Sequence, residues 1–421
     1  MQKVRRRAAA CAVALILLAT AGCTGDGKAD SKHSRTATIA VDKPAALADE
    51  AVHVRISGLI SGEEVTVTTH TTDVRNMGWS GRAVFTADAK GIVDLGYAEP
   101  ESGTYRGADA MGLFWSMIPA KGDPDQSAFE PSYPQRSPSY RIKLAVVSGG
   151  RIIAERLLTR TWTMEGVRHK TLTVAKDKLR GELFLPPTGG PRKAPVLLLG
   201  GSEGGVTVIK QFMAALLASR GHPALALCYF NCQGRPQNLA GISLDYFATA
   251  ARYLRGQPQA DARRLAVIGV SRGSEAAQLM AQYYPELVQD AVVYAPSRNT
   301  NGAYPTGCCG TGRAAWTKDG KELNLIPIPL NHVRGTVLAV AGGDDRLWGS
   351  LSSAESIAQE RGATGHLHRA LLYPKAGHGI GSFPYLPFGV GYGGGSLGGT
   401  RAANARSMVN SWPQVLQLLG R

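Results

Sequence analysis

Hydrophobic and polar positions alternate along the first half of the chain, in short runs that end at Gly, Pro, Asp or Asn. Apolar residues at every second position are typical of half-buried antiparallel strands. The clearest runs cover residues 52–56, 65–69, 140–146 and 154–163. This pattern predicts an all-β, immunoglobulin-like sandwich domain over residues 39–165. No catalytic grouping stands out within it, so we expect this domain to shape or cover a site rather than to perform chemistry.

From residue 166 onward the pattern changes to continuous apolar runs separated by helix-like stretches. Unbroken apolar runs are typical of parallel strands that are buried on both faces of a sheet. Strands that alternate with helices predict a doubly wound, mostly parallel sheet over residues 166–421. Ligands of such sheets bind at the carboxyl ends of the strands. The expected strands are 194–199, 224–229, 265–268, 290–295 and 336–340, and the expected helices are 209–220, 244–255 and 275–281.

The segment 269–273 reads Gly-Val-Ser-Arg-Gly, between an expected strand and an expected helix. This is the G-x-S-x-G pattern of a nucleophile elbow, which exposes the serine oxygen on a tight turn at the top of an α/β-hydrolase sheet. In a chain with 51 glycines the pattern also arises by chance, but the strand before it and the helix after it favour the elbow. We therefore predict Ser271 as a nucleophile.

A serine nucleophile needs a base and an acid, and in α/β-hydrolases these follow the serine in the order acid, then histidine. Asp344 and Asp345 come directly after the expected strand 336–340. We choose Asp345 as the acid, with Asp344 as the alternative. His378 follows the next apolar run and is flanked by glycines, whereas the histidines at 366 and 368 precede that run, at the wrong end of the strand. We predict His378 as the base.

An acyl-transfer site also needs N–H donors for the oxyanion of the tetrahedral intermediate. The backbone N–H of Arg272 is the expected first donor, because it follows the nucleophile. Ser202, in the glycine-rich loop 200–205, is the expected second donor. We expect the Arg272 side chain to be solvated and give Glu203 no role. We expect no cofactor and no metal, since no His or Cys has the spacing of a zinc site.

The N-terminus has the pattern of an export signal. Basic residues at positions 3–7 precede an apolar run at 8–19, and small residues then lead to Cys23, as in a bacterial lipobox. We expect residues 1–22 to be removed, Cys23 to carry lipid, and 23–38 to form a flexible tether, which places the protein outside the cytoplasm on the bacterial cell membrane. The alternative is an ordinary secretory signal with an incidental cysteine. The run is too short for a spanning helix, which needs ~20 apolar residues.

Charge and cysteines add little to this interpretation. Loss of the four basic residues of the signal lowers the formal net charge from +15 to +11, which favours anionic surfaces only diffusely. Basic and aromatic residues are not clustered in the way that indicates nucleic-acid binding. Disulfides can form outside the cytoplasm, and our preferred pair is Cys232 with Cys308 or Cys309, although the sequence does not fix the pairing.

These residues resemble the acyl-CoA thioesterase and bile acid-CoA:amino acid N-acyltransferase family. The resemblance extends from about residue 40 to the C-terminus. Its matching stretches are 45–50, 52–59, 91–95, 103–105, 111–117, 180–187, 244–247, the elbow, Asp344-Asp345 with Trp348, 373–378 and 394–412. It implies an N-terminal sandwich, an α/β-hydrolase domain, and Ser271, Asp345 and His378 as the triad. Family members that conjugate acyl groups to amino acids carry Cys at the nucleophile and thioesterases carry Ser, so Ser271 implies hydrolysis.

Two features depart from the family. Its familiar members act on CoA thioesters inside cells, whereas this chain has an export signal. The segment 297–330 also differs, and we expect it to form a cap or lid over the acyl pocket. The leading hypothesis is therefore a serine hydrolase that acts on an acyl thioester or ester. The alternatives are an acyltransferase with a non-water acceptor and a non-catalytic binding lipoprotein.

Overall fold

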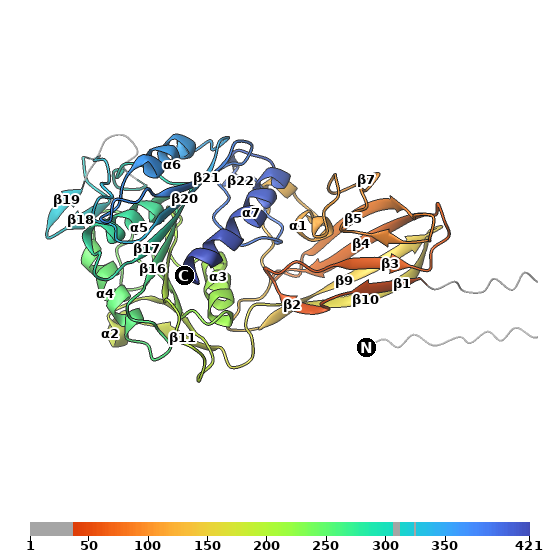
Figure 1. Cartoon of the computed structure of the whole chain (residues 1–421), viewed down its shortest axis with the longest axis horizontal. Coiled ribbons are helices and arrows are strands. Elements are labelled where there is room, and N and C mark those ends of the chain that lie inside the picture. Colours follow the sequence, from red (N-terminus) through yellow and green to blue (C-terminus); the bar gives the residue numbers. More distant parts are fainter. Residues whose placement is uncertain (1–36, 306–311, 324–325) are drawn as a thin grey trace, which may run out of the picture. The chain divides into compact units, whose positions relative to one another are not determined.

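The computed structural model describes residues 37–305, 312–323 and 326–421 (Figure 1). They form a β-rich N-terminal domain followed by an α/β domain, which confirms the predicted fold class. The boundary that we drew between residues 165 and 166 falls between strands β10 and β11 and stays a prediction. The expected signal, the lipidated Cys23 and nearly all of the tether lie outside the described residues.

The N-terminal domain consists of two β-sheets that enclose a common core. Alternate residues of the strands point inward, such as Ile56, Val67 and Leu144, and all three are fully buried. Most strand pairs are antiparallel as predicted, but β2 and β10 run parallel. One sheet has the order β1 (Thr38–Val41), β3 (Val54–Ser57), β6 (Val93–Asp94); the other has the order β2 (Ala45–Leu47), β10 (Arg151–Thr161), β9 (Ser139–Ser148), β4 (Glu64–Thr72), β5 (Gly78–Thr86), β7 (Ser102–Gly103), with β8 (Ile118–Pro119) also paired to β5.

The α/β domain is built on one eight-stranded sheet. Its first two strands are antiparallel to their neighbours, and the remaining six run parallel to one another. The continuous apolar runs of the sequence form the parallel strands, because both faces of these strands are covered. The sheet order is β11 (Arg168–Leu172), β12 (Gly181–Leu185), β14 (Ala224–Leu227), β13 (Val196–Leu199), β16 (Ala266–Val270), β17 (Asp290–Tyr294), β20 (Val337–Gly342), β21 (Arg369–Tyr373).

Helices cover both faces of this sheet. Leu198 belongs to the same buried cluster as residues of α3 (Val208–Ser219) and α7 (Arg401–Leu419). Its neighbours Leu197 and Leu199 belong to the cluster of α4, α5 and α6 on the other face, since successive side chains of a strand point to opposite sides. The bounds of these and the short helices are α1 (Gly112–Trp115), a 3₁₀ helix (Pro124–Gln126), α2 (Val174–Asp177), α4 (Leu244–Arg255), α5 (Arg272–Tyr283) and α6 (Ser350–Gln359).

Two smaller sheets lie outside the main one. Strand β15 (Ile242–Ser243) pairs with β18 (Trp316–Lys318), which pairs with β19 (Lys321–Leu323). A short hairpin joins β22 (Gly391–Tyr392) and β23 (Gly395–Ser396) through two glycines that both have positive φ. No helix among the described residues is long and apolar enough to cross a membrane.

The α/β domain contacts the sandwich through a buried polar and aromatic interface. Trp162, just after β10, stacks on Phe212 of α3 with ring centroids 4.0 Å apart. The indole N–H of Trp412 donates to the buried carboxylate of Asp49 over 2.6 Å, and Arg220 forms an ion pair with the same carboxylate at 2.9 Å. The core cluster is continuous from the sandwich to the α3 and α7 face of the sheet.

The expected disulfide is wrong. Cys232 is bonded to Cys228, four residues earlier, and not to Cys308 or Cys309, both of which lie outside the described residues. Cys228 directly follows β14, and the chain then turns back through Asn231, whose φ is +54°. This turn places the two Cα atoms 6.7 Å apart, within the range that a disulfide spans.

Candidate active site

Ser271 lies on a strained turn between β16 and α5. Its φ of +54° and ψ of −122° are unusual for a residue with a side chain and cost about 1–3 kcal/mol. Two hydrogen bonds hold the turn: the Ser271 N–H donates to the Tyr294 carbonyl over 3.0 Å, and the Ser274 N–H donates to the Ser271 carbonyl over 2.9 Å. This is the geometry of a nucleophile elbow.

The two glycines of the motif permit this turn because other backbone passes where their side chains would be. A Cβ on Gly269 would collide with the carbonyl of Gly273. A Cβ on Gly273 would collide with the carbonyls of Leu199 and Gly200 at the end of the neighbouring strand β13. The motif thus brings the serine turn against the loop that follows β13.

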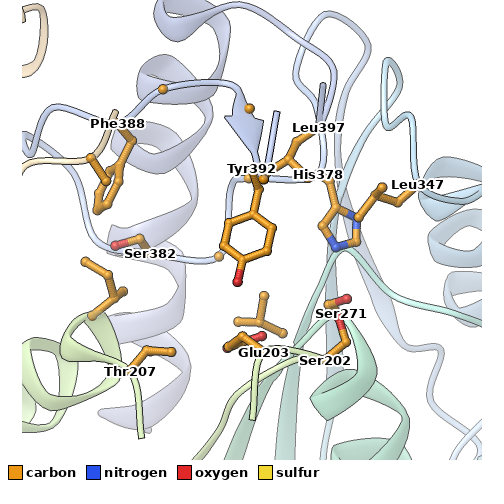
Figure 2. A pocket seen from close by; sticks show the side chains of 18 of the residues that line it. Ser202, Glu203, Thr207, Ser271, Leu347, His378, Ser382, Phe388, Tyr392 and Leu397 are labelled. Atoms are coloured by element: carbon orange, nitrogen blue, oxygen red, sulfur yellow. The ribbon is translucent and has the colours of Figure 1, made fainter. Parts of the chain in front are cut away.

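His378 and Asp345 are brought together from two neighbouring loops. Asp345 follows β20 and His378 follows β21, so both stand at the carboxyl edge of the sheet with Ser271. The His378 Nδ1 and the Asp345 Oδ2 are hydrogen-bonded at 2.8 Å, and both side chains are buried. Figure 2 shows the imidazole of His378 over the Ser271 side chain, and both residues line one pocket. The three residues that the sequence singled out therefore meet at one place.

The environment of Asp345 favours its ionised form. Burial alone would raise its pKa, but the hydrogen bond and charge of His378 and the hydrogen bonds from Ser350 and the Leu347 N–H outweigh burial, so the pKa lies below its usual value. The His378 ring also contacts Trp348, whose ring centroid is 5.6 Å away and nearly perpendicular. These contacts fix the imidazole in one orientation.

The alternative acid, Asp344, points elsewhere. One carboxylate oxygen of Asp344 accepts a hydrogen bond from the Gly399 N–H at 2.8 Å, and the other faces Arg346 at 3.4 Å. The backbone hydrogen bond is the main reason that the pKa of Asp344 lies below its usual value. Asp344 thus holds the loop before α7, and Asp345 is the carboxylate that reaches the histidine.

The loop after β13 lies beside the elbow and offers backbone N–H groups. Ser202 and Glu203 line the same pocket as Ser271, and Figure 2 shows Ser202 next to Ser271. The Glu203 carboxylate, to which we gave no role, accepts a hydrogen bond from the Gly201 N–H at 2.9 Å. The hydroxyl of the buried Tyr229 donates to the Gly200 carbonyl over 2.6 Å. The loop is therefore fixed from both sides, as a preorganised oxyanion site requires.

The Arg272 side chain is not solvated as expected. It is buried, and its Nε forms an ion pair with the fully buried Glu275 carboxylate at 2.8 Å. Its Nη2 donates to the carbonyls of Asn301 and Gly302. Both Arg272 and Glu275 belong to the first turn of α5, and their hydrogen bonds hold the segment after β17 in place. The Arg272 side chain is therefore engaged away from the pocket, and its backbone N–H lies at the N-terminal turn of α5.

The pocket has a volume of about 550 Å³, and its exposed lining surface is mostly apolar. The expected lid is wrong for the part of 297–330 that the structure describes: none of those residues lines the pocket. Trp316 from that segment is instead buried against Tyr229 and Phe247 on the α4 face. The lining comes from Gln126, Ser127, Ala128, Ser202, Glu203, Thr207, Ile209, Lys210, Val270, Ser271, Leu347, His378, Gly379, Gly381, Ser382, Phe388, Gly389, Gly391, Tyr392, Gly393, Leu397 and Met408.

Two parts of this lining were missed by sequence reasoning. The sandwich domain contributes 126–128, which run beside Phe388 and hold it by backbone hydrogen bonds on both sides. Lys210 lines the pocket from within α3 and is buried, in a helix whose other buried residues are mostly apolar. The signal in the sequence that could have identified Lys210 as a pocket residue was a lysine at a position where the helix pattern predicts core. Within the described residues no cluster of three His, Cys, Asp or Glu could hold a metal ion.

Two family models match this chain. The acyl-CoA thioester hydrolase/BAAT N-terminal region matches residues 49–174, and the BAAT/acyl-CoA thioester hydrolase C-terminal model matches residues 242–305 and 313–421. Together they cover more than half of the chain. The protein belongs to the acyl-CoA thioester hydrolase/BAAT family.

Relatives of this thioester hydrolase/BAAT family member align over most of its length. Acyl-coenzyme A thioesterase 1 of Rattus norvegicus is 28% identical over 365 residues, which cover 80% of this chain and 84% of the relative. Acyl-coenzyme A thioesterase 3 of Mus musculus is 27% identical over 418 residues, which cover 91% and 94%. The structure of a dienelactone hydrolase from Anabaena variabilis matches with a TM-score of 0.35 and 19% identity, over 51% of this chain and 89% of that one.

Proposed function

We propose that this family member is a serine hydrolase that cleaves acyl thioesters or esters through Ser271, His378 and Asp345. The observation that carries the proposal is the 2.8 Å hydrogen bond between His378 and Asp345, placed over an elbow serine in a pocket large enough for an acyl chain. The names of the relatives, which are acyl-CoA thioesterases, support a thioester as the substrate.

The reaction proceeds in two halves. The Nε2 atom of His378 accepts the proton of the Ser271 hydroxyl as its oxygen attacks the acyl carbonyl, and Asp345 stabilises the imidazolium that forms. The C–S or C–O bond of the substrate then breaks, and His378 protonates the leaving thiol or alcohol. Water, deprotonated by His378, attacks the acyl-Ser271 carbonyl and releases the carboxylic acid and free Ser271.

The negative charge on the carbonyl oxygen of each tetrahedral intermediate needs nearby donors. The backbone N–H groups of Arg272 and Ser202 are the ones that we propose. Arg272 is the first residue of α5, where N–H groups have no partner within the helix and the helix dipole is positive. A donor of this kind contributes ~3–4 kcal/mol to the transition state.

The test uses a fluorophosphonate probe and a panel of acyl-CoA and 4-nitrophenyl esters. We expect the probe to label Ser271, and the Ser271→Ala variant to lose the label and at least ~10⁴-fold in kcat. Absence of labelling in folded wild-type protein would sink the serine-hydrolase proposal and leave a binding protein. Including amine acceptors separates hydrolysis from acyl transfer: amide product in amounts equal to the free acid would contradict simple hydrolysis.

We also propose that the mature protein begins at a lipid-modified Cys23 and is anchored outside the cytoplasm. The basic, apolar and small-residue order of positions 3–23 supports this. Mass spectrometry of the N-terminal peptide from the native host should show Cys23 with diacylglyceryl mass. An unmodified terminus at another residue would refute the anchor while leaving the proposed chemistry untouched.

A further inference from the structure

We propose that the acyl group of the substrate ends in a carboxylate, which binds at the end of the pocket formed by Lys210, Ser382 and Thr207. This inference rests on the proposed function, because it concerns the acyl chain that Ser271 would carry. It narrows the substrate class from acyl thioesters or esters in general to half-thioesters or half-esters of dicarboxylic acids. The argument depends on a buried ammonium with one hydrogen bond and a buried hydroxyl with none among the described residues.

The first group is the ammonium of Lys210. The residue is only 5% exposed, and its Nζ donates one hydrogen bond, to the Gly381 carbonyl at 3.3 Å. An ammonium has three N–H groups, and Lys210 forms no ion pair with any described carboxylate. A buried charge without an anionic partner is costly, and charged residues are almost never buried unpaired. A ligand anion would supply the close ion-pair partner that the described residues do not.

The second group is the hydroxyl of Ser382, which follows the residue that Lys210 contacts. Ser382 is 5% exposed, and its Oγ has no hydrogen-bond partner among the described residues. Thr207 lines the same part of the pocket, three residues before Lys210 on the same side of the helix start. One carboxylate can accept hydrogen bonds from an ammonium and from both hydroxyls, because it has two oxygens with about four lone-pair sites.

Electrostatics support the same assignment. Burial lowers the pKa of Lys210 to about 8, and Glu203, which also faces the pocket, acts in the opposite direction. The lysine is therefore still mostly protonated at neutral pH. A carboxylate beside it would offset the cost of burial and favour the charged form further.

The position of this polar end suits an acyl chain attached to Ser271. Figure 2 shows Ser382 and Thr207 at one end of the pocket and Ser271 and His378 at the other. Figure 2 shows Tyr392 between these two ends, and Ile209, Val270 and Phe388 contribute apolar wall to the same pocket. An acyl chain held at its carbonyl by Ser271 would pass this apolar wall before its far end reaches Lys210. The arrangement selects for a short apolar linker with an anionic end.

The test compares adipoyl and hexanoyl thioesters of N-acetylcysteamine, an uncharged thiol. The two acyl groups have equal length and differ only in a terminal carboxylate. We expect wild-type kcat/KM to favour the adipoyl substrate, and Lys210→Met to lower the adipoyl-to-hexanoyl ratio at least tenfold. Lys143→Met, on an exposed face of the sandwich, is the matched control, and we expect it to leave the ratio unchanged. A ratio that Lys210→Met does not alter would overturn the inference.

Two further arms keep the outcome interpretable. Hexanoyl-3-mercaptopropionate carries the carboxylate on the leaving group: a Lys210-dependent preference for it, with none for the adipoyl thioester, would overturn the acyl-side assignment. Titration of free adipate into folded Ser271→Ala protein measures binding without catalysis, and we expect Ser382→Ala in that background to weaken it. Hydrolysis of hexanoyl thioester that depends on Ser271, without any carboxylate preference, would leave the proposed function intact and reject this inference alone.

Discussion

Replacement of Asp345 by Asn tests the roles of two neighbouring aspartates at once. The change keeps size and shape but removes the charge that faces His378 Nδ1 at 2.8 Å. At a charge separation of roughly 4 Å and an effective dielectric constant of about 20, the interaction of aspartate with imidazolium is about 4 kcal/mol. Loss of this term from the transition state corresponds to ~10³ in rate. An amide also favours the wrong tautomer of the imidazole, which brings the expected loss in kcat to ~10⁴.

The assay is kcat for hexanoyl thioester hydrolysis, followed by release of the thiol, with Asp344→Asn as the matched control. Asp344 is partly exposed, and among the described residues its carboxylate accepts hydrogen bonds from the Gly399 N–H and, more weakly, from Arg346. An Asn side chain still accepts from that N–H, so we expect kcat to change less than about threefold. A large loss in Asp344→Asn with little change in Asp345→Asn would refute the assignment of the acid.

Three further predictions concern stability. Gly273→Ala places a methyl group against two backbone carbonyls, so we expect a lower Tm and loss of probe labelling; an unchanged Tm would contradict the tight packing of the elbow. Trp412→Phe removes a hydrogen bond to the buried Asp49 carboxylate, and we expect a loss of about 1.5–3 kcal/mol in urea unfolding, which a control on an exposed aromatic should not show. Cys232→Ser opens a five-residue disulfide loop, for which chain entropy predicts a loss of roughly 2 kcal/mol; equal stability with and without reductant would argue against the bond.

The sequence alone was enough to predict the helices and strands that are marked by local capping residues and by a regular spacing of apolar residues. The helix predicted at 244–255 has those bounds in the structure, because Ser243 caps it and Gly256 follows it. The order of Ser271, Asp345 and His378 was readable because each follows a buried strand, and parallel strands end at the same edge of a sheet. The three residues meet because of the sheet topology, and the order of strands and helices in the sequence predicts that topology.

Features that depend on contacts between distant segments were not readable. The pairing of Cys228 with Cys232 depends on a reversal at Asn231, a residue that occupies positive φ without a glycine signal. The described part of 297–330 forms no lid because Trp316 is buried on the α4 face, where Tyr229 and Phe247 offer an aromatic site for it. Which residues line the pocket depends on which loops contact one another above the sheet. The periodicity of apolar residues predicts strands and helices but does not predict which loops contact one another.

Helix α7 links the sandwich to the catalytic histidine that we propose. Near its start, Arg401 donates to the carbonyls of Ser116 and Met117 in the sandwich domain. One turn later, Asn404 accepts a hydrogen bond from the N–H of Gly377, the residue before His378. The same helix start therefore fixes both the sandwich and the loop that positions the imidazole. Since the sandwich also supplies residues 126–128 to the pocket wall, it is part of the active site that we propose, although it contributes none of the three triad side chains.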